Sequence, residues 1–412
     1  MNKVLIEIIS PHTLRFFTRL ATTLVGTGAV VHFATNRLDL YRRARASGFP
    51  VFLIRRHATN PDTPDLSKNP LVRLGAYTLH QASALYTSSA EAFRRLHARH
   101  TYTHLFIFSG NDISQQGLAA VARTFGVKTL FFEIGNIEGK TFVDPKGVNA
   151  RSLLYEEPSI LEPFAASDSD YRRWRAHYLE MKDHAHVIPQ ARRRPSHRET
   201  REGLRDKFIR NAGNISGLTC YAQPSLLRRS IADRLAALHP ITLDTVDLDK
   251  SPFVFYPMQV SNDSQILLNS ETDNIAAIRH VAVIAAQRKQ RLLVKPHPAE
   301  PSARLLRRVA DLRDDLDFAL VDNNTFHLIK AAAAVFTINS TVGLEALIMD
   351  KPVTFLGQSL FAHFRDNHDF LMRYILGYLL NVSVFGDDPV SEETVQRLLE
   401  RANIASTRET QP

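Results

Sequence analysis

Two stretches decide the fold of this chain: Leu292-Leu-Val-Lys-Pro-His-Pro298 and Phe336-Thr-Ile-Asn-Ser-Thr-Val-Gly-Leu-Glu-Ala-Leu347. Each begins as an apolar run and ends in polar residues, which is the pattern of a buried parallel strand followed by its carboxyl-terminal loop. In an open α/β sheet, ligands bind at the carboxyl ends of the strands. The sequence therefore predicts an α/β fold with a binding site where these two strands end.

The polar residues after the two strands suit a phosphate group. The second strand leads into a helix through three polar residues, Asn339, Ser340 and Thr341. Their hydroxyls and free backbone N–H groups meet the positive end of the helix dipole. Lys295 and His297 add cationic or donor groups beside it, and Glu345 lies one turn into the helix, within reach of a ribose diol. These residues predict a nucleotide-sugar site.

Strand and helix patterns alternate through both halves of the chain, which predicts mainly parallel sheets covered on both faces. The strands expected in the first half are Val4–Ile9, Ala29–Ala34, Val51–Ile54, Leu105–Ser109 and Lys128–Glu133. Those expected in the second half are Phe253–Tyr256, Arg291–Val294, Phe318–Val321, Val335–Ile338 and Val353–Leu356. Two Rossmann-like domains facing a central cleft form the GT-B arrangement, so we expect a GT-B-like α/β fold.

The alternation breaks after about Gly135 and resumes at Ile241. We therefore expect an N-terminal, acceptor-side domain over residues 1–240 and a C-terminal nucleotide-sugar domain over residues 241–368. Residues 369–412 are predicted to form C-terminal helices and a tail that is disordered from Thr407. The chain is long enough for two cores of this size.

The segment over residues 150–235 is rich in arginine, and the whole chain carries a net charge of +9. This charge favours an anionic partner, such as a membrane face, a glycan or a lipid acceptor. A solvated helical surface is the alternative interpretation. No aromatic ladder, zinc finger or RNP-type strand accompanies the arginines, so we expect no nucleic-acid partner.

Other features narrow the class of protein. The one cysteine, Cys220, excludes an intrachain disulfide and a cysteine-built zinc site. The N-terminal run contains Glu7 and no small-residue cleavage site, and no apolar run approaches the roughly 20 residues of a membrane span. These features predict a cytoplasmic protein. His184 and His186 lack helical spacing and a third ligand, and no nucleotide-cofactor motif occurs, so neither a metal nor a cofactor is expected.

A polar loop follows the first strand of the second half. It carries four candidate residues, Gln259, Asp263, Ser264 and Gln265. A carboxylate at this place can act as nucleophile or base when water is excluded. The alternative interpretation of Asp263 is a helix or turn cap, and the spacing does not separate the two.

A second polar loop follows the last strand of the first half. Glu133 ends that strand against Gly135, and Asp144, Asn149 and Arg151 follow in a long glycine-bearing segment. Such loops are more often functional than not. We expect a functional role for Glu133, whereas Asp144 fits a turn before Pro145 at least as well as a catalytic role.

These motifs together resemble the bacterial capsule polysaccharide biosynthesis family. The resemblance rests on Glu133-Ile-Gly135, Gly147-Val-Asn149, Pro257-Met-Gln-Val-Ser-Asn-Asp-Ser-Gln265, Lys295-Pro-His-Pro298 and Asn339-Ser-Thr-Val-Gly-Leu-Glu345. It runs from about residue 105 to 365 and is most specific in the C-terminal motifs. Studied members of the family are retaining β-Kdo transferases that use CMP-Kdo, including some that build a Kdo linker on a phosphatidylglycerol-type lipid.

The resemblance implies a role for each candidate residue. Asp263 would be the nucleophile of a double displacement, and Glu133 the acid/base that activates the acceptor hydroxyl. The donor nucleotide would be held by Lys295, His297, Asn339, Ser340, Thr341 and Glu345, with His297 also catalytic. Acceptor contact or support would come from Gln259, Ser264, Gln265, Asn149 and Arg151.

The resemblance also implies partners, and two other functions remain open. The implied partners are a CMP-sugar donor, an anionic lipid or glycan acceptor, the cytoplasmic face of the inner membrane, and the capsule assembly machinery. One alternative is a CDP-glycerol-type glycerophosphotransferase of capsule or teichoic-acid synthesis. The other is a non-catalytic partner in capsule export. The joint presence of Glu133, Asp263, His297 and Glu345 favours an enzyme, because a binding module does not need all four.

Overall fold

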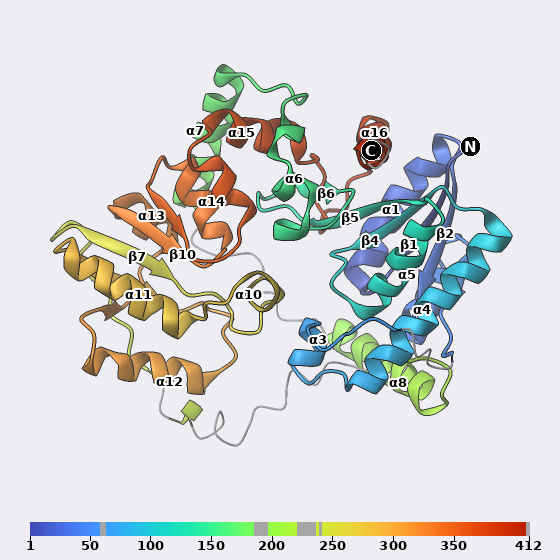
Figure 1. The fold of residues 1–412 in the computed structure, drawn as a ribbon, viewed down its shortest axis with the longest axis horizontal. Helices are drawn as coiled ribbons and strands as arrows, with labels where there is room; N and C mark the ends of the chain where they lie inside the picture. Colours follow the sequence, from blue (N-terminus) through green and yellow to red (C-terminus); the bar gives the residue numbers. More distant parts are fainter. Residues whose placement is uncertain (58–62, 185–196, 221–235, 239–240, 409–412) are drawn as a thin grey trace. The chain divides into compact units, whose positions relative to one another are not determined.

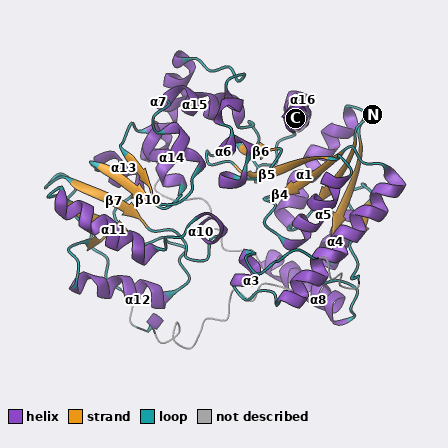
Figure 2. Ribbon diagram, in the orientation of Figure 1, coloured by secondary structure: helices purple, strands orange, loops and turns teal. Residues whose placement is uncertain are grey.

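A computed structural model describes residues 1–57, 63–184, 197–220, 236–238 and 241–408 (Figure 1). The chain divides into two compact units. The first comprises Met1–Glu157, Pro195–Ser225 and Tyr378–Pro412, and the second comprises Pro158–Arg194 and Leu226–Gly377. Each unit has its own sheet, and Figure 2 shows helices beside the strands of both. The predicted α/β class with two Rossmann-like units is confirmed.

The first unit is built on a six-stranded sheet with the order β3-β2-β1-β4-β5-β6. Its strands are β1 (Lys3–Glu7), β2 (Val30–Thr35), β3 (Val51–Leu53), β4 (His104–Phe108), β5 (Lys128–Ile134) and β6 (Thr141–Asp144). All neighbours pair in parallel except β5 and β6, which are antiparallel. The five expected strands of this half are therefore confirmed.

Strand β6 was not predicted from the sequence. Gly135 and Gly139 made this region read as a loop, yet the chain turns back there and pairs Glu133 with Phe142. Four consecutive buried residues, 141–144, make β6 an edge strand covered by the fold. A run this short carries too little periodicity to be recognised from sequence alone.

Several helices of the first unit begin at a capping side chain. The helices of this unit are α1 (Pro11–Gly26), α2 (Leu38–Arg45), α3 (Pro70–Arg73), α4 (Leu79–His100), α5 (Ile113–Thr124), α6 (Leu153–Glu156), α8 (His197–Ile215) and α16 (Glu392–Arg408), with a 3₁₀ turn at Asn149–Arg151. Ser10, Thr78 and Asp112 each form a capping box with the third helical residue.

The second unit is built on a five-stranded parallel sheet with the order β11-β10-β7-β8-β9. Its strands are β7 (Phe253–Pro257), β8 (Arg291–Lys295), β9 (Ala319–Leu320), β10 (Ala334–Thr337) and β11 (Val353–Phe355). Its helices are α7 (Asp168–His184), α10 (Ser264–Asn269), α11 (Asn274–Gln287), α12 (Ala303–Asp311), α13 (Thr325–Ala331), α14 (Thr341–Ile348) and α15 (His368–Arg373). Shorter turns lie at Pro158–Leu161, Leu312–Asp314, Leu360–Phe364 and Tyr374–Tyr378. All five strands expected in this half are confirmed.

The C-terminal segment does not form the separate end that we predicted for residues 369–412. From Tyr378 onward it belongs to the first unit, where residues 380–384 and one face of α16 join the core around β1 and β5. Val395, Leu398 and Ala402 form that face, with the spacing of one helical stripe. The pattern predicted the helix, but only the tertiary structure shows which core it completes. Helix α16 continues to Arg408, and residues 409–412 lie outside the described part.

The boundary predicted at residue 240 also differs from the observed division. Residues 158–194 lie in the predicted N-terminal domain but pack with the second unit. Helix α7 attaches this stretch to the second unit: Arg175 pairs with Asp350 (2.6 Å), and Asp183 lies 3.3 Å from His327. In the basic segment, the arginines at 192–194 and 228–229 lie outside the described residues.

Candidate functional site

The candidate donor site lies at the carboxyl edge of the second sheet. Strand β7 is central, with β10 on one side and β8 on the other. The loops that follow these three strands carry the predicted residues, at 258–265, 296–302 and 338–341. Because the strands are adjacent and parallel, their loops meet at one edge. The edge is thus built from three adjacent strands, with the strand that precedes Gln259 and Asp263 in the middle.

Gln259 and Asn339 tie the loop after β7 to the loop after β10. The Gln259 Nε2 donates to Asn339 Oδ1 at 2.9 Å, and the Asn339 N–H donates to Gln259 Oε1 at 2.9 Å. The Asn339 Nδ2 also donates to the backbone carbonyl of Gln265 at 3.0 Å. Both side-chain atoms of Asn339 are thereby engaged by the protein. Asn339, expected to bind nucleotide, is placed to support the loops instead.

Glu300 ties the loop after β7 to the loop after β8. It accepts hydrogen bonds from the Ser261 N–H (2.7 Å), the Ser261 hydroxyl (2.9 Å) and the Ser302 N–H (2.9 Å). Asn274 adds a second brace, because it accepts from the Gln259 N–H and donates to the Gln259 carbonyl. Neither Glu300 nor Asn274 was predicted from the sequence to lie at this site. Glu300 could have been found from its position in the sequence, because it lies three residues after His297 in the same polar loop.

His297 has a defined tautomer. Its Nδ1 accepts a hydrogen bond from the Ala299 N–H at 3.1 Å, so the neutral ring carries its proton on Nε2. Burial lowers the pKa of His297, against the opposing charges of Asp263 and Glu300. The imidazole is therefore neutral near pH 7 and offers an Nε2–H donor at the edge of the sheet. Its electrostatic coupling to Asp263 places the two predicted catalytic groups in one neighbourhood.

Asp263 is the N-cap of α10. Its Oδ1 accepts from the Gln265 N–H at 2.8 Å, which is the capping role left open by the sequence. Among the described residues, Oδ2 has no hydrogen-bond partner, and the side chain is half-buried. Ser264 begins the helix, and the Gln265 side chain accepts from Asn269. The cap orients the carboxylate without using both of its oxygens.

Helix α14 presents its N-terminus at the same edge. Ser340 is the N-cap and accepts from the Val342 N–H at 3.2 Å. Thr341 is exposed, and within the described ranges its N–H and hydroxyl have no partner. Free donors at a helix N-terminus favour an anion. This arrangement agrees with the phosphate-binding role expected for Ser340 and Thr341.

The Lys295 ammonium, expected to bind the donor phosphate, contacts backbone carbonyls in this structure. Its Nζ donates to the carbonyl of Asn323 at 2.5 Å and lies 3.5 Å from that of Asp322, so the ammonium is bound to the loop before α13. Burial lowers the pKa of Lys295. A direct contact with a donor phosphate would require this side chain to leave those carbonyls.

Glu345 lies on α14 and is contacted by α7. The Lys182 Nζ lies 2.7 Å from Glu345 Oε1, and the Tyr178 hydroxyl donates to the same oxygen at 3.2 Å. Neither residue of α7 was singled out from the sequence. Their separation from Glu345 along the chain left no local signal.

The acceptor-side candidates belong to the first unit. Glu133 is the penultimate residue of β5, and its Oε1 accepts from the Ile134 N–H at 2.9 Å. Asn149 has a positive φ of 53° and opens the 3₁₀ turn that carries Arg151, whose pKa is lowered by burial. Their roles at the acceptor remain predictions.

Asp144 is an organiser of the polar loop. It is fully buried and accepts from four backbone N–H groups, those of Lys146, Gly147, Leu153 and Leu154, and from the Tyr378 hydroxyl. Burial raises the pKa of Asp144 in spite of these donors. The turn-forming interpretation is therefore the one that the geometry supports.

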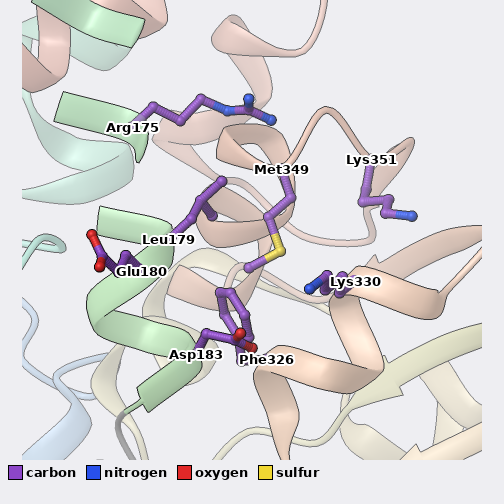
Figure 3. A pocket seen from close by; sticks show the side chains of 8 residues that line it. All are labelled: Arg175, Leu179, Glu180, Asp183, Phe326, Lys330, Met349 and Lys351. Carbon is purple, nitrogen blue, oxygen red and sulfur yellow. The ribbon is translucent and has the colours of Figure 1, made fainter. Parts of the chain in front are cut away.

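A pocket of about 330 Å³ lies between α7, α13 and the end of α14. Figure 3 shows Leu179, Phe326 and Met349 near its middle, with Lys330 and Lys351 to one side. None of the predicted donor residues lines it. In the described part of the chain, no group of three His, Cys, Asp or Glu side chains could hold a metal ion. No helix there is long and apolar enough to cross a membrane.

Comparison with known proteins finds relatives connected with capsule polysaccharides. Residues 204–364, which contain all three loops, match the model of the family described as capsule polysaccharide biosynthesis protein. This match supports a place for the chain in the capsule polysaccharide biosynthesis family. The chain is also 24% identical over 318 residues to the capsule polysaccharide export protein KpsS of Escherichia coli, covering 69% of this chain and 76% of the relative.

Two further proteins are similar over different lengths. Protein FixF of Sinorhizobium fredii is 37% identical over 121 residues, which is 28% of this chain and 29% of that protein. Among solved structures, the β-Kdo 2,7 transferase of Thermosulfurimonas dismutans KpsC has a TM-score of 0.47 and 14% identity, covering 98% of this chain and 100% of that chain.

Proposed function

We propose that this protein is a retaining glycosyltransferase of capsule polysaccharide biosynthesis, which transfers β-Kdo from a CMP-sugar to a glycolipid or glycan acceptor. One observation carries the proposal. A carboxylate, a neutral imidazole and the open N-terminus of α14 gather at the carboxyl edge of one parallel sheet. The family match covers the same loops, and the resemblance described above supplies the donor and the stereochemistry.

The leaving phosphate needs donors that stabilise its developing charge. The Nε2–H of His297 and the free N–H and hydroxyl of Thr341 are of that kind. His297 acts here as a hydrogen-bond donor and not as a cation, because its lowered pKa keeps the ring neutral near pH 7. The Ser340 cap holds the helix start in place.

The proposed reaction has two displacements. A carboxylate oxygen of Asp263 bonds to the anomeric carbon while the bond from that carbon to the phosphate oxygen breaks, and CMP leaves. Glu133 then takes the proton of the acceptor hydroxyl, whose oxygen displaces Asp263 from the anomeric carbon. Each displacement inverts the configuration, so the product retains that of the donor.

The nucleophile assignment is tested by Asp263→Asn. Asparagine still caps α10, so the variant should fold and bind CMP while losing transfer. The matched control is Asp273→Asn, since Asp273 caps α11 in the same way, with a 2.8 Å bond from the Ala276 N–H. Normal turnover by Asp263→Asn would contradict the assignment.

The donor is tested by thermal stabilisation with CMP, UMP, ADP and CDP-glycerol. A shift with CMP but not with the others supports a CMP-sugar donor. A shift confined to CDP-glycerol would move the function to glycerophosphate transfer. We further propose that the protein acts at the cytoplasmic face of the inner membrane. Its net charge of +9 supports this location, because the lipids of that face are anionic.

A role in capsule export is the second candidate, because the relative KpsS is named as a capsule polysaccharide export protein. An export partner without catalysis has no need of an open nucleotide edge. Failure of all four nucleotides to stabilise the protein would favour this role over transfer.

A further inference from the structure

Helix α7 brings two side chains to Glu345. Lys182 and Tyr178 lie one turn apart on α7 and both contact Glu345 Oε1, at 2.7 and 3.2 Å. Glu345 lies one turn into α14, whose N-terminus forms part of the candidate donor site. The stretch that carries α7 precedes the second sheet in the chain but packs with it.

The geometry leaves one carboxylate oxygen available. Both contacts use Oε1, and within the described part of the chain Oε2 has no hydrogen-bond partner. The Glu345 side chain is 19% exposed, so it is partly open to solvent. A carboxylate can accept several hydrogen bonds, and a vicinal diol is a donor that fits a free oxygen beside a phosphate site.

Lys182 is itself held in place. Its Nζ lies 5.5 Å from the centroid of the Tyr178 ring, in cation–π contact. The Tyr178 ring stacks on Trp174, with centroids 5.1 Å apart and an interplanar angle of 18°. The ammonium therefore meets Glu345 from a supported position rather than from a free side chain.

Docking of α7 does not depend on this contact. Arg175 donates to the Ile348 carbonyl (2.5 Å) and to Asp350 (2.6 Å), and Asp183 lies 3.3 Å from His327. These anchors hold α7 at both ends of its contact with α13 and α14. The side chains of α7 that contact Glu345, Lys182 and Tyr178, are thus different from those that anchor the helix.

We infer that Lys182, aided by Tyr178, is a positioning residue of the donor site: it holds Oε1 of Glu345 and turns Oε2 toward the ribose hydroxyls of the nucleotide. The inference rests on the proposed function. It adds a helix from the preceding segment of the chain to the nucleotide site. Loss of Lys182 should weaken the recognition of the ribose and leave the recognition of the phosphate intact.

The test compares CMP with 2′-deoxy-CMP by calorimetry on the full chain. Lys182→Met should weaken CMP about ten-fold, as expected for a lost charge-assisted contact, and should leave 2′-deoxy-CMP nearly unchanged. Arg175→Met is the matched control, because it removes another contact between α7 and α14 without touching Glu345. It should preserve the preference of the wild type for CMP. Lys182→Arg should restore part of that preference.

Each other outcome overturns the inference. Equal weakening of both nucleotides, no weakening, or tighter binding by Lys182→Met would show that Lys182 does not orient Glu345 toward the ribose. Should Lys182→Met fail to fold, Tyr178→Phe takes its place, with an expected loss of about three-fold for CMP alone. A wild-type protein that binds neither nucleotide would refute the proposed function itself, which separates the two failures.

Discussion

Replacing Glu7 by glutamine should remove a pH-dependent loss of stability from the first unit. Glu7 ends β1 and is fully buried, and the Ser114 hydroxyl donates to its Oε1 at 2.5 Å while Oε2 has no partner within the described residues. Burial, with a smaller contribution from the charge of Asp112, raises the pKa of Glu7 from 4.5 to about 8. Glutamine keeps the acceptor for Ser114 and has no proton to lose.

The magnitude follows from the two pKa values. In the unfolded chain Glu7 ionises above pH 4.5, whereas in the folded protein it keeps its proton up to about pH 8. The folded state binds more protons in this window, so the wild type loses stability as pH rises, by about 1.4 kcal/mol per pH unit. The loss stops above about pH 8. The advantage of Glu7→Gln should therefore grow by about 4 kcal/mol between about pH 5 and pH 8.

Urea unfolding followed by circular dichroism over this pH range measures the difference between variant and wild type. Glu138→Gln is the control, because Glu138 is an exposed glutamate of the same unit and its difference should stay flat. A flat difference for Glu7→Gln as well would refute the reasoning, since it would mean that Glu7 ionises in the folded protein as easily as in the unfolded chain.

Three substitutions test the packing, each by urea unfolding against the wild type. Asp144→Asn should cost about 2–4 kcal/mol, because an amide NH₂ would face backbone N–H donors, and an unchanged midpoint would contradict the organising role. Arg401→Met should cost about 2–4 kcal/mol, because it removes the donor of two buried carbonyls that dock α16; a loss below about 0.5 kcal/mol would sink this account. Gly343→Ala should cost about 1–3 kcal/mol, since its Cβ would lie 2.4 Å from the Phe355 ring, and full stability would show that the ring can move.

Local patterns predicted much of the fold. Phe253–Tyr256 and Arg291–Val294 are buried strands because apolar runs of this length must pair inside a sheet, and they lie where expected. The Ser340 cap and the start of α14 followed from residue type alone. That the polar loops gather at the carboxyl edge followed from the rule for parallel sheets.

What the sequence by itself determined is therefore which segments become strands, which become helices, and at which edge polar residues gather. Only the tertiary structure decided that Lys182 meets Glu345 across 163 residues, that Asn339 is engaged by Gln259, and that α16 completes the core of the first unit. Periodicity reports that a face is apolar or that a loop is polar, because those preferences act over a few neighbours. It carries no record of which distant face or side chain becomes the partner, since that depends on the path of the whole chain.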